Sequence, residues 1–549
     1  MFHEDAPGFS EDEPGGQNSY DVIVVGSGGG LIGAYLAAAR GLRTLLIEKT
    51  DKVGGTTAYS GAGIWFPGSA PIERSGAEHG LESARTYLRT VVSDPSREAR
   101  QEAYLQAGAA VIDELERNPW FGEFQFMPVP DYYSSIPGSS PSGRTIFPAP
   151  VSVAELGAEA ELVRKPLFTE RWGIDEGPVV TGGRALIGRA LKAFLATGYG
   201  ELRLGTALES LVSDDDGKVV GIVAVVDGER VTFNAGLGVI LAAGGFERDA
   251  GLRAKHQSPD LTGEWSNGAP ENTGDALKAA VAVGAGTDLL DEAWFIPGVV
   301  QPDGLPIFHT GTRGGIWVNA AGERFVNETA PYDQSGHAIY RGHTETETSH
   351  MPVRWVFDQR YLDRYSFGGP PDMPPGREWF DSGALVKADT LEELALMIDV
   401  PVQALQASVE QFNGYAKTGV DEQFHRGEST WDHFSSHIVG FPAGPVMNYM
   451  APPEEGLANP LLAPLDTAPY YAATIRLSDI GTKGGVVTDE HARVLRPDGQ
   501  AIVGLYAAGN TMAAMSGHVY PGAGTPIGSS IAFAYRAVLD LASSARSAP

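Results

Sequence analysis

The sequence predicts an α/β protein, in which a discontinuous, Rossmann-like domain is interrupted by an inserted α+β domain. Three observations favour this fold. An apolar run at 21–25 leads into a glycine-rich turn and a short alanine-rich helix at 34–40. A second apolar run, at 45–47, ends on the acidic residue Glu48. Strand-and-glycine character then returns after about residue 470, so the domain is built from both ends of the chain.

The glycine-rich turn has the chemistry of a pyrophosphate site, because helix N-terminal N–H groups attract phosphate oxygens. Its residues are Gly26, Ser27, Gly28, Gly29 and Gly30. Glu48 stands 48 − 26 = 22 residues after the first glycine, where a carboxylate can bind a ribose hydroxyl. Leu31 replaces the third glycine of the G-x-G-x-x-G pattern, so the helix is expected to start differently. We still expect dinucleotide binding, because Gly26 and Gly28 are present.

The elements that follow are predicted from their composition. The stretch 54–63 is rich in glycine and hydroxyl groups, which favours a loop against a flat polar ligand. Helical periodicity covers 81–117, and aromatic residues, prolines and glycines at 121–142 indicate a surface or lid-like segment. A helix at 183–195 precedes a hairpin at 202–226, and a buried strand at 236–246 ends in glycines.

A shift towards Pro, Trp, Tyr, His and Arg from about residue 293 predicts the insertion. We therefore expect a disordered lead-in at 1–19, a dinucleotide domain at 20–292 with 470–549, and an inserted substrate-capping domain at 293–469.

Composition excludes several classes of protein. The 549 residues exceed a single core, and 40 basic against 69 acidic side chains give a net charge of −29, which disfavours nucleic-acid partners. Without cysteine there is no disulfide, thiolate metal site or Cys-ligated iron–sulfur cluster. No His/Asp/Glu cluster has metal-ligand spacing, so no metal is expected. The acidic N-terminus lacks a signal-peptide pattern and no apolar run is long enough to span a membrane, so we expect a cytoplasmic protein.

Four motifs together resemble the FAD-dependent 3-ketosteroid Δ1-dehydrogenases, within the wider fumarate reductase/succinate dehydrogenase flavoprotein superfamily. They are G-G-T-T-A-Y-S-G at 54–61, A-G-G-F at 243–246, G-T-K-G-G at 481–485 and Y-P-G-A-G at 520–524. The resemblance runs from about Tyr20 to Ala542, and the last motif is the most specific.

The resemblance implies FAD at the glycine-rich turn, held non-covalently because the 54–63 loop has no histidine. It implies that a helix starting near Ile527 directs its positive end at the flavin. Besides the glycine-rich turn and Glu48, the implied FAD-binding residues are Lys49, Gly55, Thr56, Thr57, Ser60, Gly61, Gly63, Ala207, Gly244, Asn510, Pro526 and Ile527.

The resemblance also implies desaturation of the C1–C2 bond of a 3-ketosteroid, a step in degradation of steroid ring A. The hydroxyl of Tyr520 and the backbone N–H of Gly524 would polarise the C3 carbonyl. Tyr332 would take the C2 proton, and Tyr132 would hydrogen-bond Tyr332, with Tyr133 an open alternative. His518 is interpreted as structural or pocket-lining.

The implied partners are a 3-ketosteroid and an external electron acceptor such as a quinone, and peripheral contact with a membrane is left open. Three rivals remain: a Δ4-(5α)-dehydrogenase on the same scaffold, a fumarate reductase-like enzyme and a non-catalytic flavin-binding protein. The Y-P-G-A-G segment argues against the first. The second needs arginines to clamp two carboxylates, and 510–530 has none.

Overall fold

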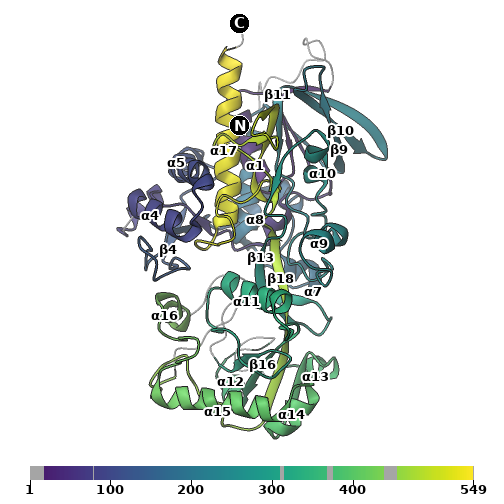
Figure 1. Cartoon of the computed structure of the whole chain (residues 1–549). Helices are drawn as coiled ribbons and strands as arrows, with labels where there is room; N and C mark the ends of the chain where they lie inside the picture. The colour runs from purple at the N-terminus through teal and green to yellow at the C-terminus, as the bar shows by residue number, and fades with distance from the viewer. Residues whose placement is uncertain are drawn as a thin grey trace. The chain divides into compact units, whose positions relative to one another are not determined.

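The computed structural model describes residues 18–77, 80–309, 314–365, 367, 375–437 and 454–547 (Figure 1). The chain forms two compact units. Unit 1 comprises Met1–Gln257, Gly268–Ala293 and Gly481–Pro549, and unit 2 comprises Ser258–Asn267 and Trp294–Ile480. The predicted lead-in lies outside the described residues up to residue 17. The domain boundaries expected from the sequence stay a prediction, since compactness does not test whether each part folds alone.

Unit 1 is built on a twisted sheet whose strands run in the order β20-β21-β11-β1-β2-β8. The four pairings from β21 to β8 are parallel. Val22, Val24, Leu45 and Leu46 have no exposed surface, as expected where helices cover both faces of a parallel sheet. The strands are β1 (Ser19–Val25), β2 (Thr44–Ile47), β8 (Gly200–Arg203), β11 (Glu229–Leu241), β20 (Arg493–Leu495) and β21 (Ala501–Ala507).

Helix α1 (Gly29–Ala38) packs against both α8 (Gly182–Ala196) and α17 (Thr525–Ser547), and α5 (Glu98–Glu116) packs on α17 (Figure 1). The predicted hairpin is confirmed as β9 (Thr206–Ser213) and β10 (Val219–Val226), which extend β11 by antiparallel pairing. The remaining elements are α2 (Gly55–Tyr59), β3 (Ile64–Trp65), α3 (Ala70–Arg74), α4 (Leu81–Val92), η1 (Pro95–Arg97), β4 (Gln125–Met127), β5 (Thr145–Phe147), β6 (Val151–Ser152), α6 (Val153–Leu156), η2 (Gly157–Glu161), α7 (Leu167–Trp172), β7 (Val179–Val180), α9 (Ala250–His256), α10 (Asp275–Ala282), β12 (Thr287–Asp288), β19 (Gly485–Val486) and η3 (Gly509–Thr511).

Two local predictions need correction. The stretch 54–63 is not all loop, because Gly55–Tyr59 forms the single-turn helix α2 after Gly54. The helical run predicted at 81–117 is two helices, α4 and α5. The first ends at Ser93, which has a left-handed backbone, and Pro95 opens the short turn before the second.

Unit 2 contains a mixed sheet in the order β14-β13-β18-β16-β15, with β17 also paired to β18. Its helices include α14 and α15, which lie one after the other within 391–418. The elements are β13 (Ala293–Val300), β14 (Pro306–Phe308), β15 (Ile316–Val318), α11 (Tyr332–Glu345), β16 (Val353–Asp358), α12 (Gln359–Arg364), α13 (Arg377–Asp381), β17 (Leu385–Ala388), α14 (Leu391–Met397), α15 (Val402–Thr418), α16 (Thr430–His437) and β18 (Tyr470–Thr482).

Candidate functional site

The glycine-rich turn of unit 1 lies between β1 and α1 and is shaped by close backbone contacts. Gly26 has a φ of +97°, and a Cβ there would lie 2.5 Å from the carbonyl oxygen of Ala242. A Cβ on Gly30 would lie 2.9 Å from the Cβ of Ala242, so the helix approaches the sheet closely at Gly30. This explains why Leu31 is tolerated at the third glycine position: it is a buried core side chain and not the point of closest approach.

The other face of α1 meets α17. A Cβ on Gly29 would overlap Ser530, and one on Gly33 would lie 3.0 Å from the Cβ of Ala534. The alanine-rich helix predicted at 34–40 therefore begins earlier, at Gly29, because the glycines belong to its first turns. The N-terminus of α1 has no side-chain cap, so its N–H groups are available to an anion.

Glu48, directly after β2, is bound to the glycine-rich turn. Its carboxylate accepts hydrogen bonds from the hydroxyl of Ser27 at 2.5 Å and from the N–H of Thr50 at 3.0 Å. The N–H of Thr206 donates to the Glu48 carbonyl at 2.9 Å, which places the next residue, Ala207, beside it. The ammonium of Lys49 instead pairs with Asp275 at 2.8 Å, so its charge is balanced within the protein.

Four predicted binding segments follow neighbouring strands of the sheet. The glycine-rich turn follows β1, Glu48 follows β2, Gly244 follows β11, and Asn510 lies in η3 after β21. Since these strands are parallel, their carboxyl ends meet at one edge, where dinucleotides bind in this class of fold. The residues present therefore fit the adenosine and pyrophosphate parts of FAD.

The 54–63 stretch borders this edge. The hydroxyl of Thr56 accepts hydrogen bonds from the Ala269 N–H at 2.9 Å and from the Asn272 side chain at 3.0 Å. A Cβ on Gly28 would lie 3.2 Å from the Thr57 hydroxyl, and the Ser60 hydroxyl donates to the Thr57 carbonyl at 2.7 Å. Positions 55 and 61 have open space where a Cβ would lie. These contacts fix the stretch and leave open space beside Gly55 and Gly61.

The start of α17 is close to this stretch. The helix begins at Thr525, two residues before the predicted start, so Pro526 and Ile527 lie in its first turn. Gly524, just before it, has a φ of +94°, and a Cβ there would overlap the carbonyl of Gly63. The resulting close approach brings the positive end of the helix dipole to the strand that follows the 54–63 stretch.

Tyr520 and Gly524 lie together, as the resemblance implies. The N–H of Gly524 donates to the Tyr520 hydroxyl at 3.2 Å. A carbonyl oxygen that takes the place of the Tyr520 oxygen at the Gly524 N–H would lie within reach of both the N–H and the Tyr520 O–H. The ring of Tyr132 packs against the ring of Tyr520, with centroids 5.1 Å apart. Tyr520 and Tyr132 are both buried.

The segment around Tyr132 is not a surface lid, as the prediction for 121–142 had it. Asp131 is fully buried, where it accepts a hydrogen bond from the Trp65 indole at 2.8 Å and pairs with Arg144. The Tyr132 N–H donates to the Pro521 carbonyl at 3.0 Å. Phe121, Phe124 and Pro130 are buried as well, whereas Pro128, Pro137 and Pro141 are exposed, so only part of the 121–142 stretch lies at the surface.

A further tyrosine, Tyr87, escaped the sequence analysis. Its hydroxyl donates to the Pro521 carbonyl at 2.6 Å and accepts from the Tyr133 N–H at 3.1 Å. Burial raises the pKa of Tyr87, so the phenol keeps the proton it donates. Tyr87 thus joins the 130–133 segment to the Y-P-G-A-G motif. Nothing in its helical surroundings distinguishes it in the sequence from an ordinary core residue.

Tyr332 belongs to unit 2 and is the first residue of α11. Its ring meets that of Phe308 edge to face, with centroids 4.8 Å apart. The five residues before it, 327–331, are held by buried polar contacts. The Thr329 hydroxyl donates to Asp432 at 2.5 Å, and the Trp431 indole donates to the Thr329 carbonyl at 2.9 Å.

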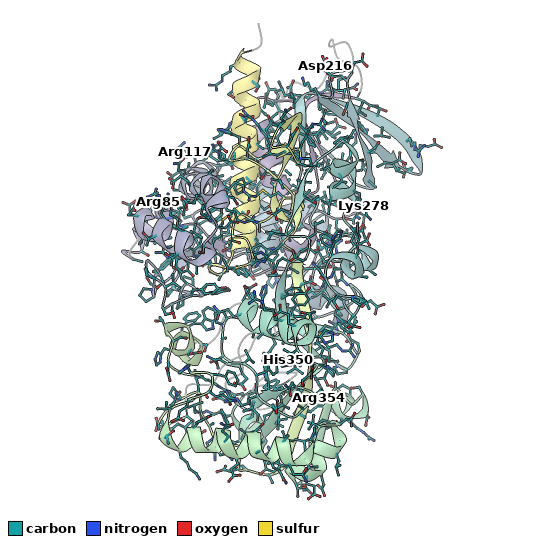
Figure 2. All side chains as sticks on the ribbon, in the orientation of Figure 1. Arg85, Arg117, Asp216, Lys278, His350 and Arg354 are labelled. Carbon is teal, nitrogen blue, oxygen red and sulfur yellow. The ribbon has the colours of Figure 1, made fainter. Side chains whose placement is uncertain are left out.

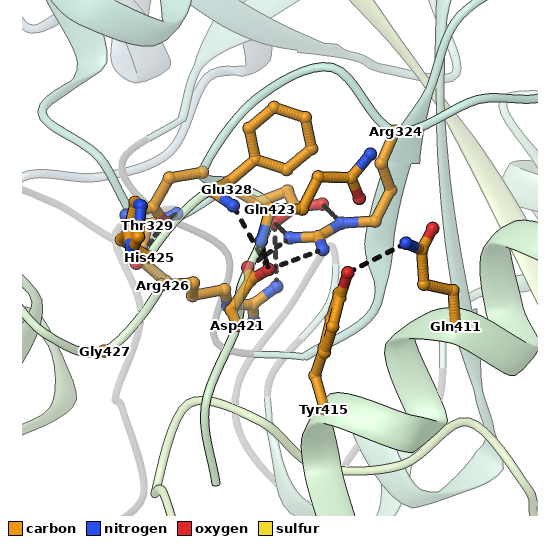
Figure 3. A network of polar contacts seen from close by, with 12 residues as sticks. Arg324, Glu328, Thr329, Gln411, Tyr415, Asp421, Gln423, His425, Arg426 and Gly427 are labelled. Carbon is orange, nitrogen blue, oxygen red and sulfur yellow. Dashed lines mark hydrogen bonds and ion pairs between the residues drawn. The ribbon is translucent and has the colours of Figure 1, made fainter. Parts of the chain in front are cut away.

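Beside this segment lies a buried ionic cluster of Arg324, Glu328, Asp421 and Arg426, whose charged ends converge in Figure 3. Glu328 receives two hydrogen bonds from Arg324 at 2.9 Å and one from Arg426 at 3.1 Å. Burial alone would raise the pKa of Glu328, but the two guanidinium groups hold it below its ordinary value. A charged Glu328 four residues before Tyr332 therefore anchors the start of α11.

Other predictions concern histidine, metals and membranes. His518 contacts Glu292 through Nδ1 at 2.8 Å, which agrees with a structural interpretation. Within the described ranges, no group of three or more His, Asp or Glu side chains is arranged to hold a metal ion. No described helix is both long and apolar enough to cross a bilayer.

Comparisons with known proteins identify relatives of this chain along nearly its whole length. A family model described as an FAD binding domain matches residues 21–527. The 3-oxosteroid 1-dehydrogenase of Mycobacterium tuberculosis is 38% identical over 96% of this chain and 99% of its own. A 4-oxocyclohexanecarboxylate 2-dehydrogenase of Sinomonas cyclohexanicum is 34% identical over 95% of this chain and 92% of its own.

A solved structure is also similar to this chain along nearly its whole length. The 3-ketosteroid Δ1-dehydrogenase of Sterolibacterium denitrificans, in complex with 1,4-androstadiene-3,17-dione, is 32% identical with a TM-score of 0.86. The match covers 96% of this chain and 100% of that one. Given the family model and these relatives along nearly the whole length, the chain belongs to the FAD-dependent 3-oxosteroid 1-dehydrogenase family of flavoprotein oxidoreductases.

Proposed function

We propose that this protein desaturates the C1–C2 bond of 3-ketosteroids. The observation that carries the proposal is the pairing of the Tyr520 hydroxyl with the Gly524 N–H, 3.2 Å apart. A C3 carbonyl oxygen bound by both groups would gain enolate character, which makes the C2 proton acidic. When bound, FAD supplies the acceptor for the hydride that leaves C1.

The proton at C2 needs a base, and we propose that Tyr332 accepts it. A phenol has an ordinary pKa of about 10, so Tyr332 requires help to act as a base at neutral pH. Tyr132 is the proposed helper, through a hydrogen bond to the Tyr332 oxygen. The buried ionic cluster supports this role, because it fixes the backbone that begins α11 at Tyr332.

Phenylalanine variants test these roles. Tyr520→Phe and Tyr332→Phe are each expected to lower kcat by about 10²-fold or more, since each removes one oxygen and keeps the ring. Tyr415→Phe, which loses only a hydrogen bond to Gln411, is the matched control and should leave kcat unchanged. If the Tyr332→Phe variant kept near-normal turnover, Tyr332 would have only a packing role and would not be the base. Comparing Tyr132→Phe with Tyr133→Phe decides which neighbouring phenol assists the base.

A substrate panel tests the reaction itself. We expect a C1–C2 double bond from 3-keto steroids and no product from the 3-hydroxy forms, which offer no carbonyl to polarise. Equal turnover of both forms would overturn the mechanism, and a C4–C5 double bond would favour the Δ4 alternative. The panel includes 4-oxocyclohexanecarboxylate, because a relative named for that ketone is also similar to this chain. A preference for it over every steroid would replace the proposed substrate class.

We further propose that FAD is bound non-covalently, because the 54–63 stretch contains no histidine. Acid precipitation should release the flavin into the supernatant, and flavin retained in the pellet would contradict this. Electrons would pass to an external acceptor such as a quinone, since a chain without cysteine cannot hold a Cys-ligated iron–sulfur cluster. The proposed location is the cytoplasm.

A further inference from the structure

A cavity in unit 2 lies apart from every residue assigned above. Its volume is about 320 Å³, and its polar lining includes Arg354, Thr474 and Arg476. The apolar part of the wall is contributed by Val300, Pro302, Pro352 and Ala384. All of these residues belong to unit 2.

The cavity forms where β18 changes neighbours within its sheet. On one side, β17 pairs with β18 only over Tyr470–Ala473, ending at Leu385. Further along, β13 is the neighbour of β18, and a Cβ on Gly298 would lie 3.3 Å from the Cβ of Ser478. Residues 474–476 of β18 thus lie between the stretch of β18 that pairs with β17 and the stretch that lies beside β13.

The two arginines share one face of this sheet. Arg354 on β16 is directly opposite Thr474 on β18, and Arg476 is two residues further along the same strand. Because side chains alternate along a strand, all three point to the same side. Arg354, labelled in Figure 2, donates to the Thr474 hydroxyl at 2.7 Å.

Neither guanidinium is neutralised by an adjacent acid. Among the residues that the structure describes, Arg354 and Arg476 form no ion pair within 4.0 Å, although the charge of the exposed Asp399 reaches Arg354. Arg476 lies over the Trp265 ring at 4.4 Å, and its Nε is buried without a hydrogen-bond partner. Burial lowers the pKa of Arg354, and the charge of Arg476 lowers it further.

Two like charges placed side by side on a sheet are unfavourable. This pair stands out because the chain as a whole carries a net charge of −29. Planar guanidinium forks match carboxylate and phosphate oxygens, and an oxyanion between them would remove the repulsion. We propose that this cavity binds a small molecule with a carboxylate or phosphate group, its anionic end on Arg354 and Arg476 and its apolar body against Val300 and Pro352.

The test measures the melting temperature of the FAD-loaded enzyme at constant ionic strength. Inorganic phosphate and cyclohexanecarboxylate are each titrated against chloride, so the two arms separate a phosphate from a carboxylate with an apolar body. We expect a saturable rise in Tm with at least one probe. The rise should disappear in Arg354→Gln and Arg476→Gln and persist in Arg377→Gln, whose side chain is 90% exposed.

A second variant tests the repulsion directly. Arg354→Glu places an acid beside Arg476, so its Tm in chloride should equal or exceed that of the wild type while the anion-dependent rise is lost. No rise with either probe in the wild type would overturn the proposal. A rise of equal size in the wild type and in the Arg354 and Arg476 variants would mean an adventitious ion only, bound elsewhere, and would overturn it as well.

Discussion

The glycine-rich turn of unit 1 and the segment before Tyr332 in unit 2 are each held in place, by opposite physical means. At the turn, backbone approaches backbone: a Cβ on Gly26 would lie 2.5 Å from the Ala242 carbonyl oxygen. Before Tyr332, the position is fixed by buried charges on Glu328, Arg324 and Arg426.

The difference has consequences for how each region fails. The turn depends on shape, so any added atom disturbs it whatever its charge or the pH. The ionic cluster depends on charge balance, so an isosteric change that removes one charge is enough to disturb it. Two experiments separate these two modes of failure, and a third tests how the stability of unit 2 depends on pH.

The largest effect is expected for Gly26→Ala, which adds one methyl group to a residue with a φ of +97°. The new Cβ would meet backbone atoms of Ala242 and Ala243, which cannot move without displacing the end of β11. We expect the purified variant to have lost most of its flavin, measured as flavin absorbance per mole of protein. Gly236→Ala, where the new Cβ would only reach the Tyr20 carbonyl at 3.7 Å, is the control. A full flavin content in Gly26→Ala would contradict the role of shape.

The next effect is expected for Glu328→Gln, which keeps the shape and removes the charge. Two buried guanidinium groups would then lose the charge of Glu328, and the free energy of unfolding should fall by about 3–5 kcal/mol in a denaturant titration. The exposed pair Arg377–Asp381 is the matched control, since Arg377→Gln should change stability by less than about 1 kcal/mol. A loss for Glu328→Gln no greater than that of the control would show that the charge is dispensable.

The smallest effect concerns pH and His309, which packs on the Trp355 ring in unit 2. Burial lowers the pKa of His309 to about 4 from 6.5, so the unfolded chain binds a proton that the folded chain does not. Its contribution to stability is complete above pH 6.5 and is lost as the pH falls towards 4, up to about 3 kcal/mol. His309→Gln should flatten the stability profile in this window, and an unchanged slope would exclude His309 as the cause. The Gly26 contacts contain no titrating group.

Much of unit 1 could be predicted from the sequence because its signals are local. The run at 21–25, the turn at 26–30 and Glu48 lie close together in the chain, and the glycines allow the backbone conformation and the close approach that the turn needs. The proximity of Tyr520 to Gly524 was also predictable, since four residues separate them. The prediction for 121–142 did not take tertiary packing into account. Aromatic residues in this stretch suggested a surface segment, although Asp131 and Tyr132 are buried.

The sequence by itself determined the α/β class, the dinucleotide-binding chemistry and the residue types available for catalysis, because these follow from composition and short-range spacing. Only the tertiary structure decided that Tyr87 joins Pro521 to Tyr133, that Glu328 lies between Arg324 and Arg426, and that Arg354 and Arg476 share a face. Arg426 is 98 residues from Glu328, and Arg476 is 122 from Arg354 (426 − 328 and 476 − 354). Strand register and helix packing set these contacts, and neither leaves a local pattern in the chain.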